Sequence, residues 1–325
     1  MSADSDADPV LVVTRLDDST ADVVIAELRA RSVPVVRLDP GDFPEQVTLS
    51  ASFTGQGLSG SLRTATRTVD LDTVRSVYWR RPSPYSAGEG VAGPDAQWCA
   101  EQARYGLGGV LAALPGAHYV NHPHRNRAAE RKPAQLAAAA RFGLSVPPTL
   151  VTNDPDQARR FAEEFGPVVY KPLWNSDYAD SDGRALTVWV EELDPDTLDA
   201  GVRHTAHLFQ KLVDKQADLR VTVVGEELFA VRIDGAAGLD WRRSYETLSY
   251  TLVQAPPDVA KAIHGFMDAF GLVYGAFDFG LDKTGRWELY ELNPNGQFAW
   301  FPEPITARIT AAIADQLQHG GRDDR

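Results

Sequence analysis

The stretch that decides the fold is Gly275-Ala276-Phe277-Asp278-Phe279-Gly280, followed shortly by Trp287-Glu288-Leu289-Tyr290-Glu291-Leu292-Asn293-Pro294-Asn295-Gly296. Its two apolar-rich segments flank a Thr284-Gly285 turn, which is the composition and spacing of a β-hairpin. Because side chains alternate faces along a strand, Glu291 and Asn293 are expected to point the same way, about 7 Å apart. The sequence therefore predicts a polar pair on one face of a largely apolar hairpin.

The register of this hairpin is expected to bring two carboxylates together. With either a two-residue or a four-residue loop around Thr284-Gly285, Asp278 lies directly opposite Glu291. Two carboxylates at roughly 5 Å repel each other, and a hard cation removes that cost. An oxygen-only set of Asp278, Glu291 and Asn293 suits Mg²⁺ held partly by substrate phosphates. The alternative is a solvated hairpin face with ordinary surface acids, but the apolar neighbours favour the metal site.

Composition limits the class of protein. The chain has 325 residues, 43% hydrophobic and 24% charged, as in a globular protein of two or three packed units. It has no apolar run of membrane-spanning length, and the acidic residues 1–8 do not compose a signal peptide. Cys99 is the single cysteine of the sequence, which excludes an internal disulfide and a multi-cysteine metal site and fits a reducing cytosol. We therefore expect a cytoplasmic enzyme or binding protein.

The charge balance argues against nucleic acid as a partner, and the lack of a long apolar run argues against a membrane. The formal net charge is −13, whereas binding a phosphate backbone needs clustered lysine and arginine. Basic clusters do occur at residues 122–132 and at Arg242-Arg243. In an acidic protein such local patches are more compatible with nucleotide phosphates or an acidic peptide.

The N-terminal part reads as a βαβ unit. Val10-Leu11-Val12-Val13 predicts a buried strand, residues 22–31 an amphipathic helix and residues 33–38 a second, parallel strand. The turn at residues 14–18 has no glycine, so it is not a dinucleotide-binding turn. An antiparallel excursion is expected at 47–71, a strand at 74–79 and a helix at 94–114.

The remaining chain predicts two further units, so the fold class is α/β with an α+β C-terminal part. The second unit starts with a helix at 128–142 that ends at Gly143, and its strands fall at 149–151 and 168–171. The polar stretch 174–183 is the best candidate for a lid loop. The third unit is mostly antiparallel strands with a helix at 259–270. The predicted domains are 1–122, 123–206 and 207–325.

Two lysines are candidate phosphate ligands. Lys171 lies at a strand end beside the polar stretch, where a compact positive charge suits a phosphate, although it could equally be an ordinary surface lysine. Lys132 is expected at the start of a helix, where its charge opposes the helix dipole unless an anion lies nearby. A flexible surface lysine is the alternative there.

The segment from Leu208 to Gly225 adds further candidates. Its apolar connector at 210–213 could hold a purine edge through free backbone groups, and Asp218 could accept hydrogen bonds from ribose hydroxyls. Arg220 and Arg232 lie in apolar strands, where a charge is costly unless it is paired. Each therefore meets either a phosphate or a carboxylate, the second being a structural salt bridge.

The order of these residues resembles the ATP-grasp superfamily, and in particular the graspetide (microviridin-type) synthetases of the actinobacterial branch. These are ATP-grasp maturases of ribosomally made peptides. The resemblance covers most of the chain, from Tyr78-Trp79-Arg80-Arg81-Pro82 through Val120-Asn121-His122-Pro123 and Asp240-Trp241-Arg242 to Glu291-Leu292-Asn293-Pro294-Asn295-Gly296-Gln297. The C-terminal motif is diagnostic for ATP-grasp folds, and the other blocks narrow the subfamily.

The resemblance implies a three-domain fold that begins with a βαβ pre-ATP-grasp domain and binds ATP between the central and C-terminal domains. Its implied roles are phosphate binding by Lys132 and Lys171, adenine binding by Gln210, Lys211, Leu212 and Val213, ribose binding by Asp218, two Mg²⁺ at Asp278, Glu291 and Asn293, and stabilisation of the transferring phosphoryl group by Arg220 and Arg232. Such enzymes phosphorylate a carboxylate, and an amine or hydroxyl then displaces the phosphate.

Two departures from the family pattern concern the substrate side. Residues 174–183 contain one glycine and three aspartates, whereas the phosphate-covering loop of many ATP-grasp enzymes is glycine-rich. In addition, Phe301-Pro302 precede Glu303, whereas an aromatic residue and then an acid commonly follow the Asn-Pro-Asn-Gly-Gln block.

The leading hypothesis is an ATP- and Mg²⁺-dependent ligase that macrocyclises a ribosomal precursor peptide with a leader and an acidic, hydroxyl-rich core. Aspartate or glutamate side chains would be activated, and serine, threonine or lysine would close the ester or amide rings. Trp241-Arg242-Arg243-Ser244-Tyr245 could grip the peptide, or could be a solvated hairpin tip. Two alternatives are a ligase that joins a free amino acid to a small carboxylate acceptor, and a non-catalytic nucleotide-dependent peptide-binding protein. A homodimer or higher homo-oligomer is expected.

Overall fold

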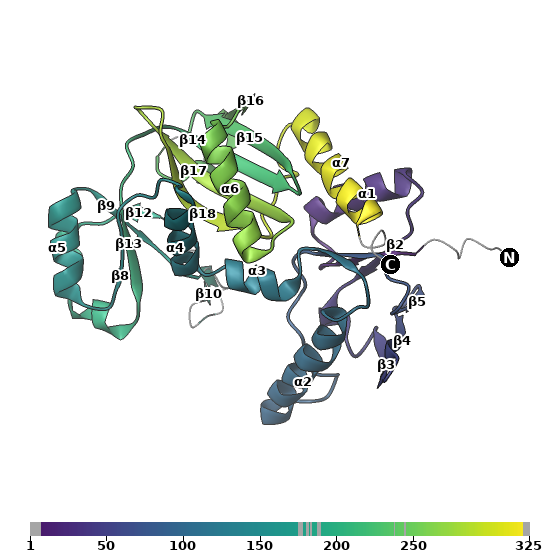
Figure 1. The fold of residues 1–325 in the computed structure, drawn as a ribbon. Coiled ribbons are helices and arrows are strands. Elements are labelled where there is room, and N and C mark those ends of the chain that lie inside the picture. Colours follow the sequence, from purple (N-terminus) through teal and green to yellow (C-terminus); the bar gives the residue numbers. More distant parts are fainter. Residues whose placement is uncertain are drawn as a thin grey trace.

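The computed structural model describes residues 8–174, 178–179, 182, 184–186, 190–236, 238–243 and 245–320. The chain forms three units, and in Figure 1 the C-terminal unit lies between the central unit at the left and the N-terminal unit at the right. Within the described residues, no helix has both the length and the apolar character needed to cross a membrane.

The N-terminal unit is a parallel four-stranded sheet in the order β2-β1-β6-β7. Its elements are β1 (Val10–Val13), α1 (Ser19–Ala30), β2 (Val35–Leu38), β6 (Ser76–Trp79), α2 (Gly93–Leu111) and β7 (His118–Val120). The strands are largely apolar, and helices cover both faces of the sheet, α2 on one side and α1 with the C-terminal helix α7 (Glu303–His319) on the other. The predicted parallel βαβ start is confirmed.

The excursion at residues 47–71 is antiparallel, as expected. It consists of β3 (Thr48–Thr54), β4 (Gly57–Arg63) and β5 (Thr68–Asp70), preceded by a short 3₁₀ helix at Pro40–Asp42. Leu62 and Val69 from this small sheet pack against the face of the parallel sheet that α2 covers. The excursion therefore extends the core of the N-terminal unit.

The central unit is a sheet in the order β12-β9-β13-β8 with one covering helix. Its elements are β8 (Thr149–Thr152), α5 (Pro155–Phe165), β9 (Val168–Lys171), β12 (Glu191–Glu192), two 3₁₀ helices at Pro195–Thr197 and Ala200–His204, and β13 (His207–Lys211). Because β13 pairs with both β8 and β9, the boundary predicted at 206/207 separates a strand from its own sheet. Most of the predicted lid, 174–183, lies outside the described residues. In this part of the chain, the described residues form a short antiparallel pair of β10 (Tyr178–Ala179) and β11 (Ala185–Leu186).

The C-terminal unit is an antiparallel sheet in the order β16-β15-β14-β17-β18. Its elements are β14 (Lys215–Val224), β15 (Glu227–Asp234), 3₁₀ turns at Trp241–Arg243 and Tyr245–Thr247, β16 (Ser249–Val253), α6 (Pro257–Phe270), β17 (Tyr274–Asp282) and β18 (Trp287–Asn293). α6 and an earlier helix, α4 (Lys132–Phe142), cover one face. The central segment of the chain thus supplies part of the C-terminal core.

The helix predicted at 128–142 is two helices. α3 (Pro123–Ala129) ends first, and α4 restarts after Arg131 with Pro133 in its first turn. A proline inside a continuous helix would lack a hydrogen bond and clash with the preceding turn, whereas the first turn tolerates it. The predicted end is confirmed, because Gly143 takes the left-handed conformation with φ of 82°.

Candidate active site

The β17–β18 hairpin carries the acidic part of the site. Asp278 pairs with Glu291, as predicted. The register near the turn differs from the prediction, however, because Leu281 pairs with Trp287 and the register then shifts between Asp278 and Phe279. The connecting loop is neither of the predicted lengths, since Asp282 bonds to Arg286 across it and Gly285 has φ of 90°. The bulge falls at Tyr290, whose extra residue restores the alignment of the two carboxylates.

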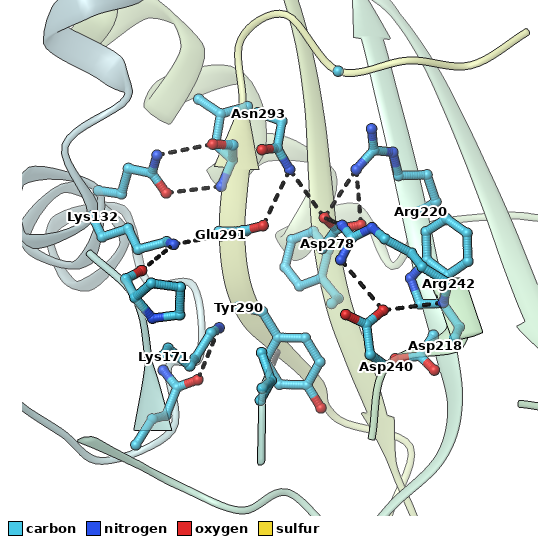
Figure 2. A pocket seen from close by; sticks show the side chains of 18 of the residues that line it. Lys132, Lys171, Asp218, Arg220, Asp240, Arg242, Asp278, Tyr290, Glu291 and Asn293 are labelled. Atoms are coloured by element: carbon cyan, nitrogen blue, oxygen red, sulfur yellow. Dashed lines mark hydrogen bonds and ion pairs between the residues drawn. The ribbon is translucent and has the colours of Figure 1, made fainter. Parts of the chain in front are cut away.

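Asp278 is surrounded by donors. Both of its carboxylate oxygens accept from Arg220 Nη1 at 2.9 Å, and Oδ2 also accepts from Arg242 Nη2 at 3.0 Å. Arg220 comes from β14, directly opposite Asp278 in the sheet, and only 5% of its side chain is exposed. In this structure the cost of a buried carboxylate is therefore removed by two guanidinium groups (Figure 2).

Glu291 is held by a lysine from another element. Lys132 Nζ at the start of α4 lies 3.2 Å from Glu291 Oε2 and donates to the Pro172 carbonyl at 2.7 Å. The positive charge of Lys132 opposes the dipole at the helix N-terminus, and Glu291 is the anion that compensates for it. Burial alone would raise the pKa of Glu291, but Lys132, Lys171 and Arg242 outweigh it and lower the pKa to about 2. Glu291 is consequently ionised throughout the neutral range.

Asn293 joins the two acids. Its Nδ2 donates to Asp278 Oδ2 at 3.0 Å and lies 3.4 Å from Glu291 Oε1, so all three side chains share one face (Figure 2). The amide presents nitrogen to the carboxylates here, and half a turn about its last bond would present oxygen to a cation between them. Within the described residues, nowhere do three or more His, Cys, Asp or Glu side chains gather as a metal site. Two carboxylates and one amide supply only part of the ligand shell of Mg²⁺, so an ion bound here would take its remaining ligands from water or a bound substrate.

Lys171 is the last residue of β9 in the central unit, and it lines the same cavity as the acidic hairpin. Its Nζ donates to Gln210 Oε1 at 3.3 Å and lies 5.1 Å from the centre of the Tyr290 ring. Burial lowers the pKa of Lys171 to about 8, against the opposing effect of Glu291. Lys171 is thus a buried cation without a carboxylate in direct contact among the described residues, unlike the surface lysine that the sequence left as an alternative.

The connector at 210–213 lies beside Lys171 and is more fully bonded than expected. The backbone N–H of Lys211 donates to Pro148 O at 2.9 Å, and that of Leu212 to Pro167 O at 2.8 Å. The expectation of free backbone groups is therefore wrong for these two. Gln210 is 2% exposed and is oriented by a hydrogen bond of 2.9 Å to Thr149 Oγ1.

Asp218 is fixed by a lysine three residues earlier. Lys215 Nζ donates to both carboxylate oxygens at 2.7 Å and to the Leu239 carbonyl at 2.8 Å. Burial raises the pKa of Asp218, and the nearby Lys215 partly offsets this effect. The three-way contact ties the segment that carries Asp240 and Arg242 to the start of β14.

All but one of the predicted site residues line one cavity of about 630 Å³ where the central and C-terminal units meet. These are Lys132, Lys171, Gln210, Lys211, Leu212, Val213, Asp218, Arg220, Asp278, Glu291 and Asn293. Among the described residues, seven cationic and five anionic side chains line the cavity, although the chain carries a net charge of −13. Such a surplus of positive charge suits a polyanionic ligand.

The prediction that Arg232 belongs to the site is wrong. Arg232 pairs in register with Leu219, one residue from Arg220, so it lies on the opposite face of the sheet. There its guanidinium bonds to Asp234 at 2.8 Å. Arg232 is thus the structural salt bridge that the sequence left open.

Sequence reasoning missed several residues at the cavity. Lys215 and Tyr290 line it directly. Gln135 is buried in α4 and holds Leu292, between the two polar residues of β18, by bonds of 2.8 Å to its N–H and 2.9 Å to its C=O. The only signal for Gln135 was an amide on the otherwise apolar face of a helix.

The chain is similar to known proteins over nearly its whole length. Residues 9–127 match the family model of the MvdD pre-ATP-grasp domain. A RiPP-associated ATP-grasp ligase from Chryseobacterium gregarium, in complex with ADP and a leader and core peptide, is 26% identical with a TM-score of 0.85, over 95% of this chain and 96% of that one. The macrocyclase MdnC of Microcystis aeruginosa MRC, bound with precursor peptide MdnA, is also 26% identical with a TM-score of 0.85, over 95% and 98%. The macrocyclase MdnB of the same organism is 27% identical with a TM-score of 0.79, over 96% and 99%.

The fold and the cavity therefore define an ATP-grasp ligase, an enzyme that uses ATP to join two groups. Within that class, the match to the pre-ATP-grasp domain and the similarity over nearly the whole chain support a graspetide-type ATP-grasp maturase. The fold class expected from the sequence, an α/β ATP-grasp fold with an N-terminal pre-ATP-grasp domain, is confirmed.

Proposed function

We propose that this protein macrocyclises a ribosomally made precursor peptide at the expense of ATP. The observation that carries the proposal is the meeting of Asp278, Glu291 and Asn293 with Lys132 and Lys171 in one cavity. This set combines oxygen ligands for a cation with fixed positive charges for phosphates, which is what phosphoryl transfer requires. Similarity to ligases bound with precursor peptides supports a peptide as the second substrate.

Different groups of residues in the cavity would bind the nucleotide and the cation. Lys132 and Lys171 would bind the phosphates of ATP, the connector 210–213 would hold the adenine, and Asp218 would hold the ribose; all of them line the cavity. Mg²⁺ bound at the acidic hairpin would neutralise charge on the transferring phosphoryl group. Arg220 orients Asp278 through two hydrogen bonds of 2.9 Å. With the nucleotide in place, the ion pairs of Lys132 and Arg242 would be exchanged for contacts to phosphate.

The reaction runs in two displacements. A carboxylate oxygen of the peptide forms a bond to the γ-phosphorus, and the bond to ADP breaks. A hydroxyl or amine of the same peptide then attacks the acyl carbon, loses its proton, and displaces phosphate. Each closed ring therefore costs the peptide one water.

Mass spectrometry of a candidate precursor, for example one encoded beside the gene, tests the proposal. After incubation with protein, ATP and Mg²⁺, we expect the loss of one or more waters. A peptide that stays unchanged while small acids stimulate phosphate release would instead favour a small-molecule ligase. Peptide binding without any chemistry would favour the binding protein.

Localisation and assembly are part of the proposal. A single cysteine in 325 residues fits a cytoplasmic protein. A homodimer or higher homo-oligomer is the expected assembly. Light scattering after size-exclusion chromatography tests it.

A further inference from the structure

Two consecutive arginines at the end of β6 have different environments. Arg80 is 2% exposed, and its Nη1 donates to the carbonyls of Asn295 at 3.3 Å and Gly296 at 3.1 Å. Its Nε also lies 3.4 Å from the buried carboxylate of Asp18. Arg80 thus fastens the N-terminal sheet to the loop that follows the acidic hairpin, so the backbone at Arg81 has a fixed position relative to the active site.

Arg81 has an exposed side chain that lines the active-site cavity. Among the described residues of the cavity wall, it is the one that the N-terminal unit supplies. No described carboxylate lies within ion-pair distance of its guanidinium. Burial, followed by the nearby charges of Arg15 and Arg80, lowers the pKa of Arg81, against the opposing effect of Asp18 and Asp17.

The other cations of the cavity already have a partner or a proposed task. Lys132, Lys215, Arg220 and Arg242 contact carboxylates of the protein. Lys171 and Lys211 belong to the wall proposed for the nucleotide. Arg81 has neither a described carboxylate within ion-pair distance nor a task in the proposed function, and its planar guanidinium group can bind a carboxylate through two parallel hydrogen bonds.

We propose that Arg81 is the anchor of a subsite for a carboxylate of the second substrate, an aspartate or glutamate side chain of the peptide. This inference rests on the proposed function, because that function requires an acidic group beside the phosphates. The pre-ATP-grasp domain then contributes a binding residue to the active site, and Arg80 keeps that residue in place.

Glutarate, a small dicarboxylate, is the probe for this subsite. Its affinity is measured by calorimetry in the presence of Mg²⁺ and a non-hydrolysable ATP analogue, for the wild type, Arg81→Met, Arg81→Lys and the control Arg63→Met. Arg63 is an exposed arginine of the same unit, on β4. We expect Arg81→Met to bind glutarate on the order of 10- to 100-fold more weakly, Arg81→Lys to be intermediate, and Arg63→Met to equal the wild type.

The affinity for the ATP analogue separates the subsite from the nucleotide site and should be equal in all four proteins. The inference is overturned if the wild type does not bind glutarate, if Arg81→Met binds it as tightly as the wild type, or if the analogue is weakened as much as glutarate. Glutarate binding through Arg81 in a protein that never dehydrates a peptide would contradict only the proposed function. Cyclisation with an unchanged KM for peptide in Arg81→Met would contradict only the subsite.

Discussion

Replacement of Asp278 by Asn should separate the structural role of this carboxylate from its chemical role. The substitution keeps the shape of the side chain but removes its charge, and it leaves Arg220, of which only 5% is exposed, without its carboxylate. Removing one partner of a buried ion pair costs about 3–5 kcal/mol. Because the Asn oxygen can still accept one bond, we expect the lower end, about 3 kcal/mol.

The double variant Arg220→Met/Asp278→Asn removes both charges and should regain most of that stability, to within about 1 kcal/mol of the wild type. Urea unfolding followed by tryptophan fluorescence measures this, and a loss of about 3 kcal/mol moves the midpoint by about 1 M if m is about 3 kcal/mol/M. Asp234→Asn is the matched control, since Asp234 pairs with Arg232 in the same sheet but is 37% exposed. It should cost less than about 1 kcal/mol.

Activity gives the second half of the test. Both Asp278 variants should fail to dehydrate a precursor peptide, even at temperatures where the double variant is fully folded, whereas Asp234→Asn should remain active. A single variant as stable as the wild type would refute the argument from burial. A folded Asp278→Asn protein that still cyclises peptides would refute the proposed role of Asp278 in binding the cation.

Three further predictions concern charged residues in the cavity and behind its sheet. Since the pKa of Lys171 is about 8, ATP affinity should fall as the pH rises through 8, and Lys171→Met should flatten this dependence in calorimetric titrations; an unchanged pH profile would contradict it. Glu291 has a folded pKa of about 2, below its ordinary value of 4.5, so its stabilising contribution is present above pH 4.5 and is lost as the pH falls towards 2. The stability difference between wild type and Glu291→Gln should accordingly be constant near neutrality and shrink in that acid range, as acid unfolding would show. Arg232→Met should keep kcat/KM within about twofold of the wild type, because the side chain lies behind the sheet, and a large loss would reinstate it as a site residue.

The acidic hairpin could be predicted because its register depends on local sequence. Alternation and a short turn were enough to oppose Asp278 and Glu291. The prediction succeeded with the wrong loop, since a bulge at Tyr290 compensates for a shift of one residue. A bulge depends on how the strand packs, so the sequence gives little sign of it.

Arg232 shows where a usable signal was overlooked. The segment around Gly225 forms a tight turn, with Val224 paired to Glu227. Counting back from that turn would have placed Arg232 opposite Leu219 and therefore on the other face from Arg220. The error came from judging each arginine by its apolar neighbours, which indicate burial but not the direction of the side chain.

The positions of Gln135 and Arg80 could not be derived in this way. Gln135 bonds to Leu292, 157 residues later, and Arg80 to the carbonyl of Gly296, 216 residues later. Such contacts exist only once the three units have assembled. The sequence shows that each residue is polar in an apolar setting, but not which distant backbone groups it will meet.

The return of α7 to the N-terminal unit has a consequence for engineering. Ile309, Ile313 and Leu317 share a core with Val24 and Leu28 of α1, and Ser76 donates to the Leu317 carbonyl at 2.7 Å. A chimera that takes only the first domain from a relative, with one crossover, would therefore pack the relative's α1 against the α7 of this protein. Grafts should carry two crossovers, one after β7 and one before Glu303, so that the first and last segments of the protein travel together.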